Sequence, residues 1–332
     1  TKEALPSQPK LLDALLMGIR DFDSQVFGGR VPWIVGMSGG LDSSVTAALL
    51  CAALGKERVY GYNIATQHNS STTISNAAKE AQALGIHYKE GNMKSLIQAS
   101  AELLRQEYGY DVEEMPSLVM ENLQARSRGY LLSGFAGILG GVVVNNGNKV
   151  ETALGYCTLY GDSIGALSVI GDLTKVQLFD LSAALNDRFG KEVIPCNLLP
   201  RVHEQGIDWE MPPSAELKDA QLDPMKWFYH DYLIEHLGRD LTLRAFMESY
   251  ADGSIWEQDI ARWLSYYGLD DPKVFISDLE WLLTTMAKNS FKRLQLPPLL
   301  SVHAKTLANK KEAQMQTDSY VFEKLKQTIL PM

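Results

Sequence analysis

The sequence predicts an α/β fold with a doubly wound, mostly parallel sheet and a helical extension on its C-terminal side. Two observations predict the sheet: short apolar segments alternate with longer amphipathic ones, and each apolar segment is nearly continuous, as in strands buried on both faces. A third observation predicts the extension, because strand signals fade after about residue 190 and aromatic-rich segments with helical spacing follow.

The elements follow in this order. A helix is expected over about 9–27, where Leu11, Leu15 and Ile19 recur at helical spacing. Strands are predicted at 31–36, at 59–65, near 86–90 and at 141–146. Helices are predicted at 42–54, at about 73–84, from the third strand through Leu104, from Pro116 to about Leu139, and at 174–189. The extension is expected to hold helices near 224–237, 241–250, 256–267 and 272–288.

The same pattern predicts the domain organisation. Residues 1–300 are interpreted as one catalytic domain, with a nucleotide-binding core over about 28–190 and the helical extension over about 190–300. Residues 301–332 are polar and contain several lysines, so a surface helix or a mobile C-terminal tail is expected there.

Composition excludes several classes of protein. A net charge of −9 argues against a nucleic-acid-binding surface, which needs a basic face. The 3 cysteines form no CxxC pair, so neither a disulfide framework nor a zinc site is expected, and a cytoplasmic setting is predicted. The apolar segment at 129–148 is short for a membrane span and is broken by Gly140-Gly141, so no membrane role is predicted.

The segment MSGGLDSS at 37–44 directly follows the first predicted strand and opens a helix. It lacks the lysine of a Walker A motif and is not the GxGxxG of a dinucleotide fingerprint. Its glycines allow close backbone approach to an anion, and the amides of 39–44 with the helix N-terminus supply partial positive charge. Asp42 would repel a phosphate but suits Mg²⁺, which bridges carboxylates to phosphates. The competing interpretation is a tight turn in which Asp42 or Ser43 caps the helix.

A second polar segment, NNGNKVE at 145–151, follows the fourth predicted strand. Because ligands bind at the carboxyl ends of parallel strands, the two segments are expected to meet at one crevice, where Glu151 would join Asp42 in a Mg²⁺ site. Asn122 and Arg126 lie one turn apart on a predicted helix, so they could hold one ligand together. The competing interpretations are a surface carboxylate for Glu151 and a solvated helix charge for Arg126.

SGGLDSS resembles the pyrophosphate loop of the ATP pyrophosphatase superfamily, whose members adenylate a substrate and have a Rossmann-like, adenine nucleotide alpha-hydrolase-like fold. Among them, residues 121–162 resemble NAD synthetase, where the motifs NxxAR, GNxxE and GYxTxYGD occur in this order. DLTK at 172–175, PPSAEL at 212–217 and FKRLQLPP at 291–298 extend the resemblance, which covers roughly residues 10–300.

The resemblance implies a ligase that forms NAD from deamido-NAD and ammonia, with ATP as co-substrate and Mg²⁺ as cofactor. The implied reaction passes through an NAD-adenylate and releases AMP and pyrophosphate. Asp42 and Lys175 would be catalytic, the latter because a cation must balance the leaving pyrophosphate, and Asp42 and Glu151 would bind the metal. The residues implied for ATP are Gly36, Met37, Ser38, Gly39, Gly40, Leu41, Asp42, Ser43, Asn146, Lys175 and Ser214. Those implied for deamido-NAD are Asn122, Arg126, Glu151 and Lys292.

The sequence departs from the family pattern at the second segment, where Asn145-Asn146 replace the usual Thr-Thr, at Asn76, where Asp is common, and in the loop at 66–72. The resemblance also implies a homodimer. Only about 30 residues precede the first predicted strand, so either free ammonia or a separate glutaminase partner is expected to supply nitrogen. Two alternatives stay open: another adenylating amidotransferase of the superfamily, or a catalytically inactive nucleotide-binding subunit.

Overall fold

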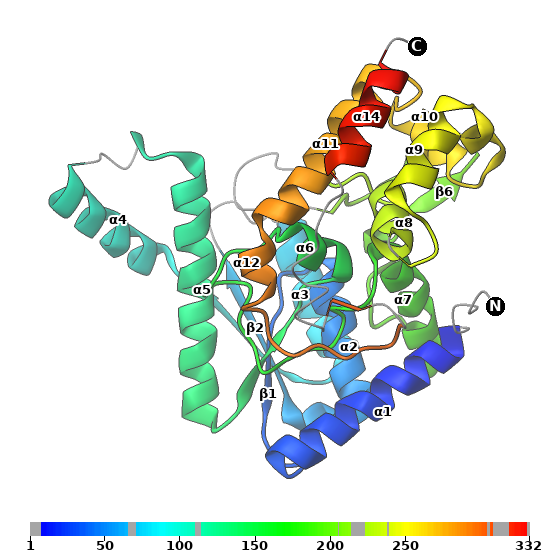
Figure 1. The fold of residues 1–332 in the computed structure, drawn as a ribbon. Helices are drawn as coiled ribbons and strands as arrows, with labels where there is room; N and C mark the ends of the chain where they lie inside the picture. The colour runs from blue at the N-terminus through cyan, green and yellow to red at the C-terminus, as the bar shows by residue number, and fades with distance from the viewer. Residues whose placement is uncertain are drawn as a thin grey trace.

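The computed structural model describes residues 8–65, 71–109, 114–204, 206–213, 223–237, 239–303, 306–307 and 319–330. Its centre is a five-stranded parallel sheet in the order β3-β2-β1-β4-β5 (Figure 1). The strands are β1 (Trp33–Gly36), β2 (Val59–Ala65), β3 (His87–Asn92), β4 (Val142–Asn145) and β5 (Leu167–Ser168). The predicted parallel α/β fold is therefore confirmed.

The first strand lies in the middle of the sheet and is the most buried. Trp33, Ile34 and Val35 have no exposed surface. Trp33 is in register with Val59 of β2 and with Val142 of β4. The carboxyl ends of β1 and β4 therefore lie side by side, which brings together the two polar segments that follow them.

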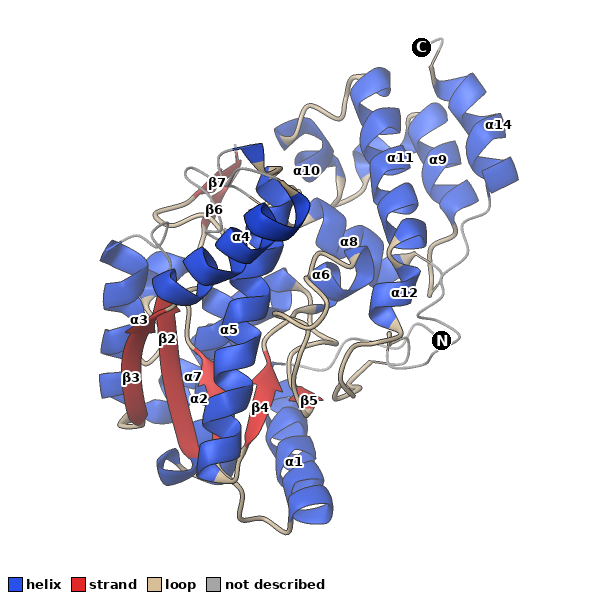
Figure 2. Ribbon diagram, turned by 90° about the vertical axis from the view of Figure 1, so that its left-hand side faces the viewer, coloured by secondary structure: helices blue, strands red, loops and turns tan. Residues whose placement is uncertain are grey.

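Helices cover both faces of the sheet, as Figure 2 shows with α5 in front of the strands. On one face α2 (Leu41–Leu54) contacts α1 (Gln8–Phe27), α3 (Ser71–Leu84) and α7 (Lys175–Phe189) over the largest apolar core. On the other face α4 (Lys94–Tyr108) packs beside α5 (Ser117–Leu139). Under α5, Leu132 packs with Ile34, Ile64 and Val143 in a smaller core.

The apolar segment at 129–148 forms the second half of α5 and then β4, a helix followed by a strand. Within the described parts of the chain, no helix has the length and apolarity needed to cross a membrane.

Helix α6 and the helices after residue 228 form a helical layer around a second apolar core (Figure 1). Its helices are α6 (Lys149–Leu154), α8 (Tyr229–His236), α9 (Leu243–Ala251), α10 (Ala261–Tyr266), α11 (Pro272–Lys288), α12 (Ser290–Arg293) and α14 (Ser319–Ile329). One short antiparallel hairpin, β6 (Arg201–His203) with β7 (Gly206–Asp208), also lies here. Strands of three residues carry too little pattern to be predicted from the sequence.

The final helix, α14, agrees with one of the two expectations for residues 301–332, a surface helix, but one of its faces is buried. In α14 the side chains of Val321, Phe322, Leu325 and Ile329 are buried in the second core, and the helix packs against α9 and α11. The four apolar positions recur at helical spacing among polar neighbours. Residues 319–329 therefore belong to the helical layer, whereas most of 301–318 lies outside the described residues.

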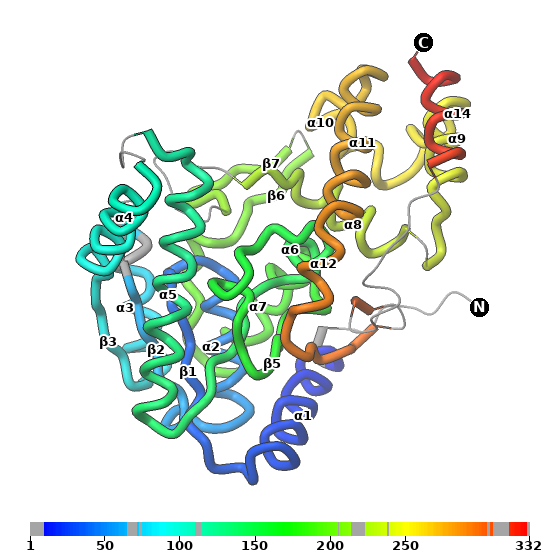
Figure 3. Tube along the Cα trace, turned by 60° about the vertical axis from the view of Figure 1, so that its left-hand side comes forward, coloured from blue at the N-terminus to red at the C-terminus, as the bar shows by residue number. Residues whose placement is uncertain are grey.

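After α12 the chain returns to the edge of the sheet (Figure 3). The amide of Ser168 in β5 donates to Pro298 O at 2.8 Å, and the amide of Leu300 donates to Ser168 O at 3.1 Å. Two residues further, the amides of Val302 and His303 donate to the buried Asp172 carboxylate at 2.8 and 3.0 Å. The helical layer and the sheet are thus joined by main-chain hydrogen bonds.

Candidate active site

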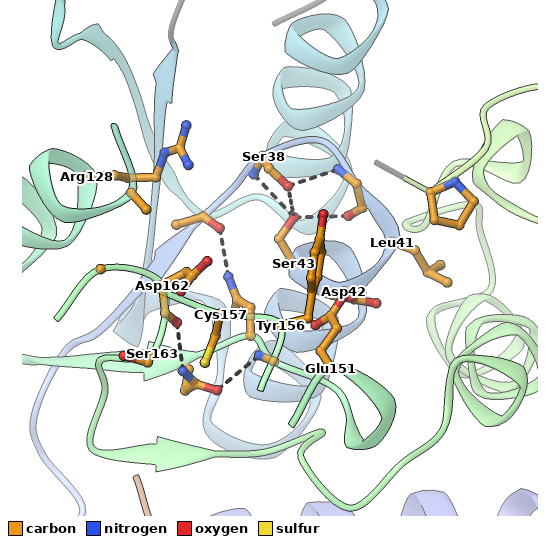
Figure 4. Close-up of a pocket in the computed structure, with 18 of the residues that line it drawn as sticks. Ser38, Leu41, Asp42, Ser43, Arg128, Glu151, Tyr156, Cys157, Asp162 and Ser163 are labelled. Carbon is orange, nitrogen blue, oxygen red and sulfur yellow. Dashed lines mark hydrogen bonds between the residues drawn. The ribbon is translucent and has the colours of Figure 1, made fainter. Parts of the chain in front are cut away.

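A cavity of about 280 Å³ opens at the carboxyl ends of β1 and β4 (Figure 4). The glycine-rich segment, the second polar segment, α5 and the start of α7 line it. Of the residues predicted for ATP or the metal, those that line it are Gly36, Ser38, Gly40, Leu41, Asp42, Ser43, Asn146, Glu151 and Lys175. Met37 instead points into the apolar core, with 1% of its surface exposed, and Ser214 lies outside the described residues.

The glycine-rich segment forms a compact turn onto the N-terminus of α2. Gly39 has φ +81°, a left-handed conformation that L side chains rarely adopt. The Ser38 amide donates to Ser43 Oγ at 3.3 Å, and Ser43 Oγ donates to Gly40 O at 3.0 Å. Gly40 is the N-cap of α2 and carries no side-chain cap, so the alternative in which Asp42 or Ser43 caps this helix is wrong. The first amides of α2 are therefore available at the cavity for an anion.

Asp42 forms a salt bridge in the cavity with Lys175, at the first position of α7. Lys175 Nζ lies 2.7 Å from Asp42 Oδ1 and 2.8 Å from Oδ2. Lys175 is only 4% exposed and also lies over the ring of Trp227 at 4.9 Å. Burial alone would lower the pKa of this ammonium, but the carboxylates of Asp42 and Glu151 raise it above its ordinary value. Lys175 therefore stays charged.

Glu151 lies in the first turn of α6, held by the cap of that helix. Asn148 Oδ1 accepts hydrogen bonds from the main-chain amides of Val150 and Glu151. In return, the main-chain amide of Asn148 donates to Glu151 Oε2 at 3.2 Å. Asn148 Nδ2 also donates to Asp42 Oδ2 at 3.1 Å, which links the two polar segments. Burial, then repulsion from Asp42, raises the pKa of the Glu151 carboxyl well above its ordinary value.

The arrangement of these carboxyl groups fits a magnesium ion. Asp42 and Glu151 lie side by side in Figure 4, and Asp223 adds a further negative charge that raises the pKa of Glu151. Within the described residues, no group of three or more His, Cys, Asp or Glu side chains is arranged to hold a metal. One or two carboxylates with substrate phosphates are the usual ligands of Mg²⁺, so these residues suit a metal that arrives with ATP.

The two asparagines that replace threonines hold the strand ends together. Asn145 Nδ2 donates to Asp162 O and Ile164 O at 2.9 and 3.0 Å. Asn146 Nδ2 donates to Gly36 O at 2.9 Å, across from β4 to the end of β1. Asn146 Oδ1 is buried at the cavity and has no hydrogen-bond partner among the described residues, so it can accept a hydrogen bond from a ligand.

Of the residues predicted for the dinucleotide, Glu151 lines the cavity, whereas the other three contact the loop at 155–162 and are not among the lining residues. Asn122 Oδ1 accepts from Thr158 Oγ1 at 2.8 Å, and Arg126 Nε donates to Leu159 O at 3.2 Å. Lys292 Nζ donates to Gly155 O and Cys157 O at 3.0 and 2.7 Å. The loop lies close against α5, because a Cβ at Gly161 would stand 2.8 Å from the backbone of that helix.

Four residues of the site were not singled out from the sequence, and three of them line the cavity. Arg128 and Asp162 line the cavity, and Figure 4 places Arg128 across it from Asp42 and Glu151. The pattern N-x-x-E could have identified Asn148 as a helix cap. Asp162 is the last residue of the motif GYCTLYGD, and burial raises the pKa of its carboxyl group. Asp223 follows residues outside the described ranges and carries no sequence signal. Asn76 lies elsewhere, in a polar pair with Asn197 at 3.1 Å.

Comparison with known proteins identifies the family of the chain. The sequence model of the NAD synthase family matches residues 27–237. The chain is 33% identical over 245 residues to the glutamine-dependent NAD(+) synthetase of Thermotoga maritima, covering 74% of this chain and 39% of that protein. It is 36% identical over 233 residues to the Synechocystis enzyme of the same name, and the match covers 69% of this chain and 38% of that protein. The chain thus spans well under half the length of these relatives.

Solved structures show the same fold. A glutamine-dependent NAD(+) synthetase from Cytophaga hutchinsonii superposes with a TM-score of 0.71 at 14% identity, over 97% of this chain and 56% of that one. The NH3-dependent NAD synthetase from Campylobacter jejuni gives a TM-score of 0.56 at 21% identity, over 89% of this chain and 100% of that one. With its family match and its curated relatives, the chain belongs to the NAD synthase family.

Proposed function

We propose that this chain amidates deamido-NAD: ATP activates the nicotinate carboxylate as an acyl-adenylate, and ammonia then displaces AMP to give NAD. One observation carries the proposal. The ammonium of Lys175 and the carboxylates of Asp42 and Glu151 converge on a glycine-rich turn whose helix N-terminus faces the same cavity. Such a set suits transfer of an adenylyl group, because it can hold three negatively charged phosphates and a metal.

In the first step an oxygen of the substrate carboxylate attacks the α-phosphorus of ATP. The bond from that phosphorus to the bridging oxygen breaks, and pyrophosphate leaves with the electron pair. The amides of 39–44 and Lys175 stabilise the charge that develops on the pyrophosphate. When bound by Asp42 and Glu151, Mg²⁺ would neutralise part of the same phosphate charge.

In the second step ammonia attacks the activated carbonyl carbon, the carbon–oxygen bond to AMP breaks, and the nitrogen loses a proton. We assign the acceptor of that proton to Asp162, which lines the cavity. No covalent enzyme intermediate is required. Cys157, the thiol at the cavity, has a pKa raised by burial to about 12, so it stays protonated and unreactive at neutral pH.

We propose that the pyrophosphate of deamido-NAD binds beside the loop of 155–162. Arg126 and Lys292 contact this loop from α5 and α12, and Arg126 is exposed. Both are cations, so both suit the pyrophosphate of a dinucleotide.

A second copy of the chain is proposed to cover α5. Arg126, Tyr130, Gly134 and Ile138 follow one another at four-residue spacing along this helix. Tyr130 is 70% exposed and Ile138 82% exposed, and a Cβ at Gly134 would meet no atom within 4 Å. Exposed apolar side chains beside a small residue suit helix packing between subunits. This stripe starts at Arg126, so the dinucleotide would lie next to the interface.

The test is a product assay with the purified chain, ATP, Mg²⁺, deamido-NAD and ammonium. NAD, AMP and pyrophosphate are expected in equal amounts, and the Asp42→Asn variant is the negative control. A second arm replaces deamido-NAD with its mononucleotide, since a fold neighbour at 20% identity is an NMN synthetase from Francisella tularensis. AMP release with other carboxylates alone would support another amidotransferase. ATP binding without any AMP would support an inactive subunit.

A further inference from the structure

Next to the glycine-rich segment, and not among the residues that line the cavity, a carboxyl group is buried that the proposed chemistry does not use. Glu80 lies on α3 and is 1% exposed. Its Oε2 lies 2.8 Å from Ser44 Oγ in the first turn of α2. Its Oε1 is buried and has no hydrogen-bond partner among the described residues.

Ser44 makes two contacts with its hydroxyl but has only one hydrogen to give. Ser44 Oγ lies 3.0 Å from Gly40 O and 2.8 Å from Glu80 Oε2. A carbonyl oxygen can only accept, and so can an ionised carboxylate. If Glu80 were ionised, the single Ser44 hydrogen would serve two acceptors and one contact would be lost. A proton on Glu80 Oε2 satisfies both contacts, because Glu80 then donates to Ser44 and Ser44 donates to Gly40.

We propose that Glu80 is a positioning residue of the glycine-rich segment, present as a neutral acid that donates to Ser44 and through it fixes the Gly40 carbonyl. This deepens the proposed function, on which its place in the reaction rests. Burial raises the pKa of Glu80 to about 8, against a smaller lowering effect of Ser44, so the acid is neutral at pH 7.

The Gly40 carbonyl matters because it sets the direction of the next amide. Ser43 Oγ, Ser44 Oγ and the Ser44 amide all donate to Gly40 O, at 3.0, 3.0 and 3.2 Å. These donors hold the carbonyl toward α2. A trans peptide is planar, so the amide of Leu41 points the opposite way from that carbonyl. Leu41 lines the cavity, and its amide is one of those that the pyrophosphate would use.

Other ionisable groups surround Glu80 and bear on its proton. Cys51 on α2 and Tyr88 on β3 interact electrostatically with it, and both have pKa values raised mainly by burial. A second cavity of about 270 Å³ borders Glu80 and is lined by Lys79 on α3, Glu192 after α7 and Glu210. Charged side chains of both signs thus face this cavity, and burial is the main cause of the raised pKa of Glu80.

The test measures binding of inorganic pyrophosphate with Mg²⁺ by calorimetry, so that it does not depend on which carboxylate is the acceptor substrate. At pH 7, Glu80→Gln should bind like the wild type, since its amide can still donate to Ser44. Glu80→Ala and Ser44→Ala should bind pyrophosphate about tenfold more weakly, because each variant loses about one hydrogen bond that holds the glycine-rich segment. Ser182→Ala is the matched control, because buried Ser182 Oγ donates to Leu178 O, four residues earlier on α7, at 2.7 Å.

The pH profile separates positioning from a merely structural role. Between pH 7 and pH 9 the wild type should lose about tenfold in affinity relative to Glu80→Gln at the same pH, because Glu80 ionises with a pKa of about 8. Parallel profiles for the two proteins would overturn the proposal, as would unchanged binding by a folded Glu80→Ala. Should Glu80→Ala not fold, the Glu80→Gln comparison still decides. Normal pyrophosphate binding without NAD formation would instead refute the proposed function alone.

Discussion

Lys175 and Asp42 stand 133 residues apart in the chain, yet the Lys175 ammonium lies 2.7 and 2.8 Å from the two oxygens of the Asp42 carboxylate. One residue opens α7 and the other lies in the first turn of α2. Asp42 therefore holds in place the cation that the glycine-rich segment itself lacks. The pair also keeps a buried ammonium charged.

Lys175→Ala should slow the adenylation step by on the order of 10²–10³, the usual cost of removing one fixed stabiliser of transition-state charge. Binding of deamido-NAD should change little. Single-turnover release of pyrophosphate without ammonia isolates this step. Lys191→Ala, an exposed lysine just beyond α7, is the matched control. An unchanged release rate in Lys175→Ala would remove Lys175 from the chemistry.

Asp42→Asn and Glu151→Gln should each nearly abolish turnover, because both carboxylates are proposed to hold one Mg²⁺ ion. The melting temperature of the wild type with ATP should rise when Mg²⁺ is added, and this increment should shrink in both variants. Near wild-type turnover of both variants at ordinary Mg²⁺ would refute a shared metal site.

The stability of Glu151→Gln should depend on pH in a defined direction. The folded protein raises the pKa of Glu151 above its unfolded value, so its contribution to stability is present at low pH and is lost as pH rises. Without metal, Glu151→Gln should therefore be more stable than the wild type at pH 8 and gain less at pH 5. Urea unfolding at the two pH values checks this, and an equal gain at both would contradict it.

Ammonium should support NAD formation by the pure chain, whereas glutamine alone should not. No glutaminase chemistry is assigned to any described residue. The measurement compares NAD yield with ammonium, with glutamine, and with glutamine plus an added glutaminase as the positive control. Efficient use of glutamine by the pure chain would contradict the prediction.

Replacing apolar residues of the α5 stripe with charge should separate the subunits of the proposed dimer. Ile138→Glu and Tyr130→Glu should shift the sedimentation of the protein from dimer to monomer, because each would bury a carboxylate in an apolar contact. Leu103→Glu, at a residue 60% exposed on α4, is the control and should leave the assembly unchanged. A wild type that sediments as a monomer would refute the dimer.

Much of the fold was predictable because its signals are local. The strand predicted at 59–65 is β2, and the helix predicted at 42–54 begins one residue earlier as α2. Asp42 and Glu151 were expected to approach each other, because the ends of parallel strands share one edge, and the structure brings them together. Their roles in binding metal and substrate stay predictions.

What the sequence did not reveal depends on contacts between distant segments. The pairing of Asp42 with Lys175 follows from the relative placement of two helices, which no local pattern encodes. Asp223 gains its importance only from lying near Glu151. Strand β5 has two residues, too few for a period; it pairs with β4 on one side, and on the other side Leu299 pairs with Ser168.

That last pairing has a consequence for how the protein is made. During synthesis the sheet emerges first, while the segment that completes its β5 edge is made more than a hundred residues later. Until Leu299 leaves the ribosome, the nascent sheet carries an unpaired edge with main-chain donors and acceptors, a template for association with other chains. Aggregation of truncated products should therefore persist until the segment around Leu299 is included.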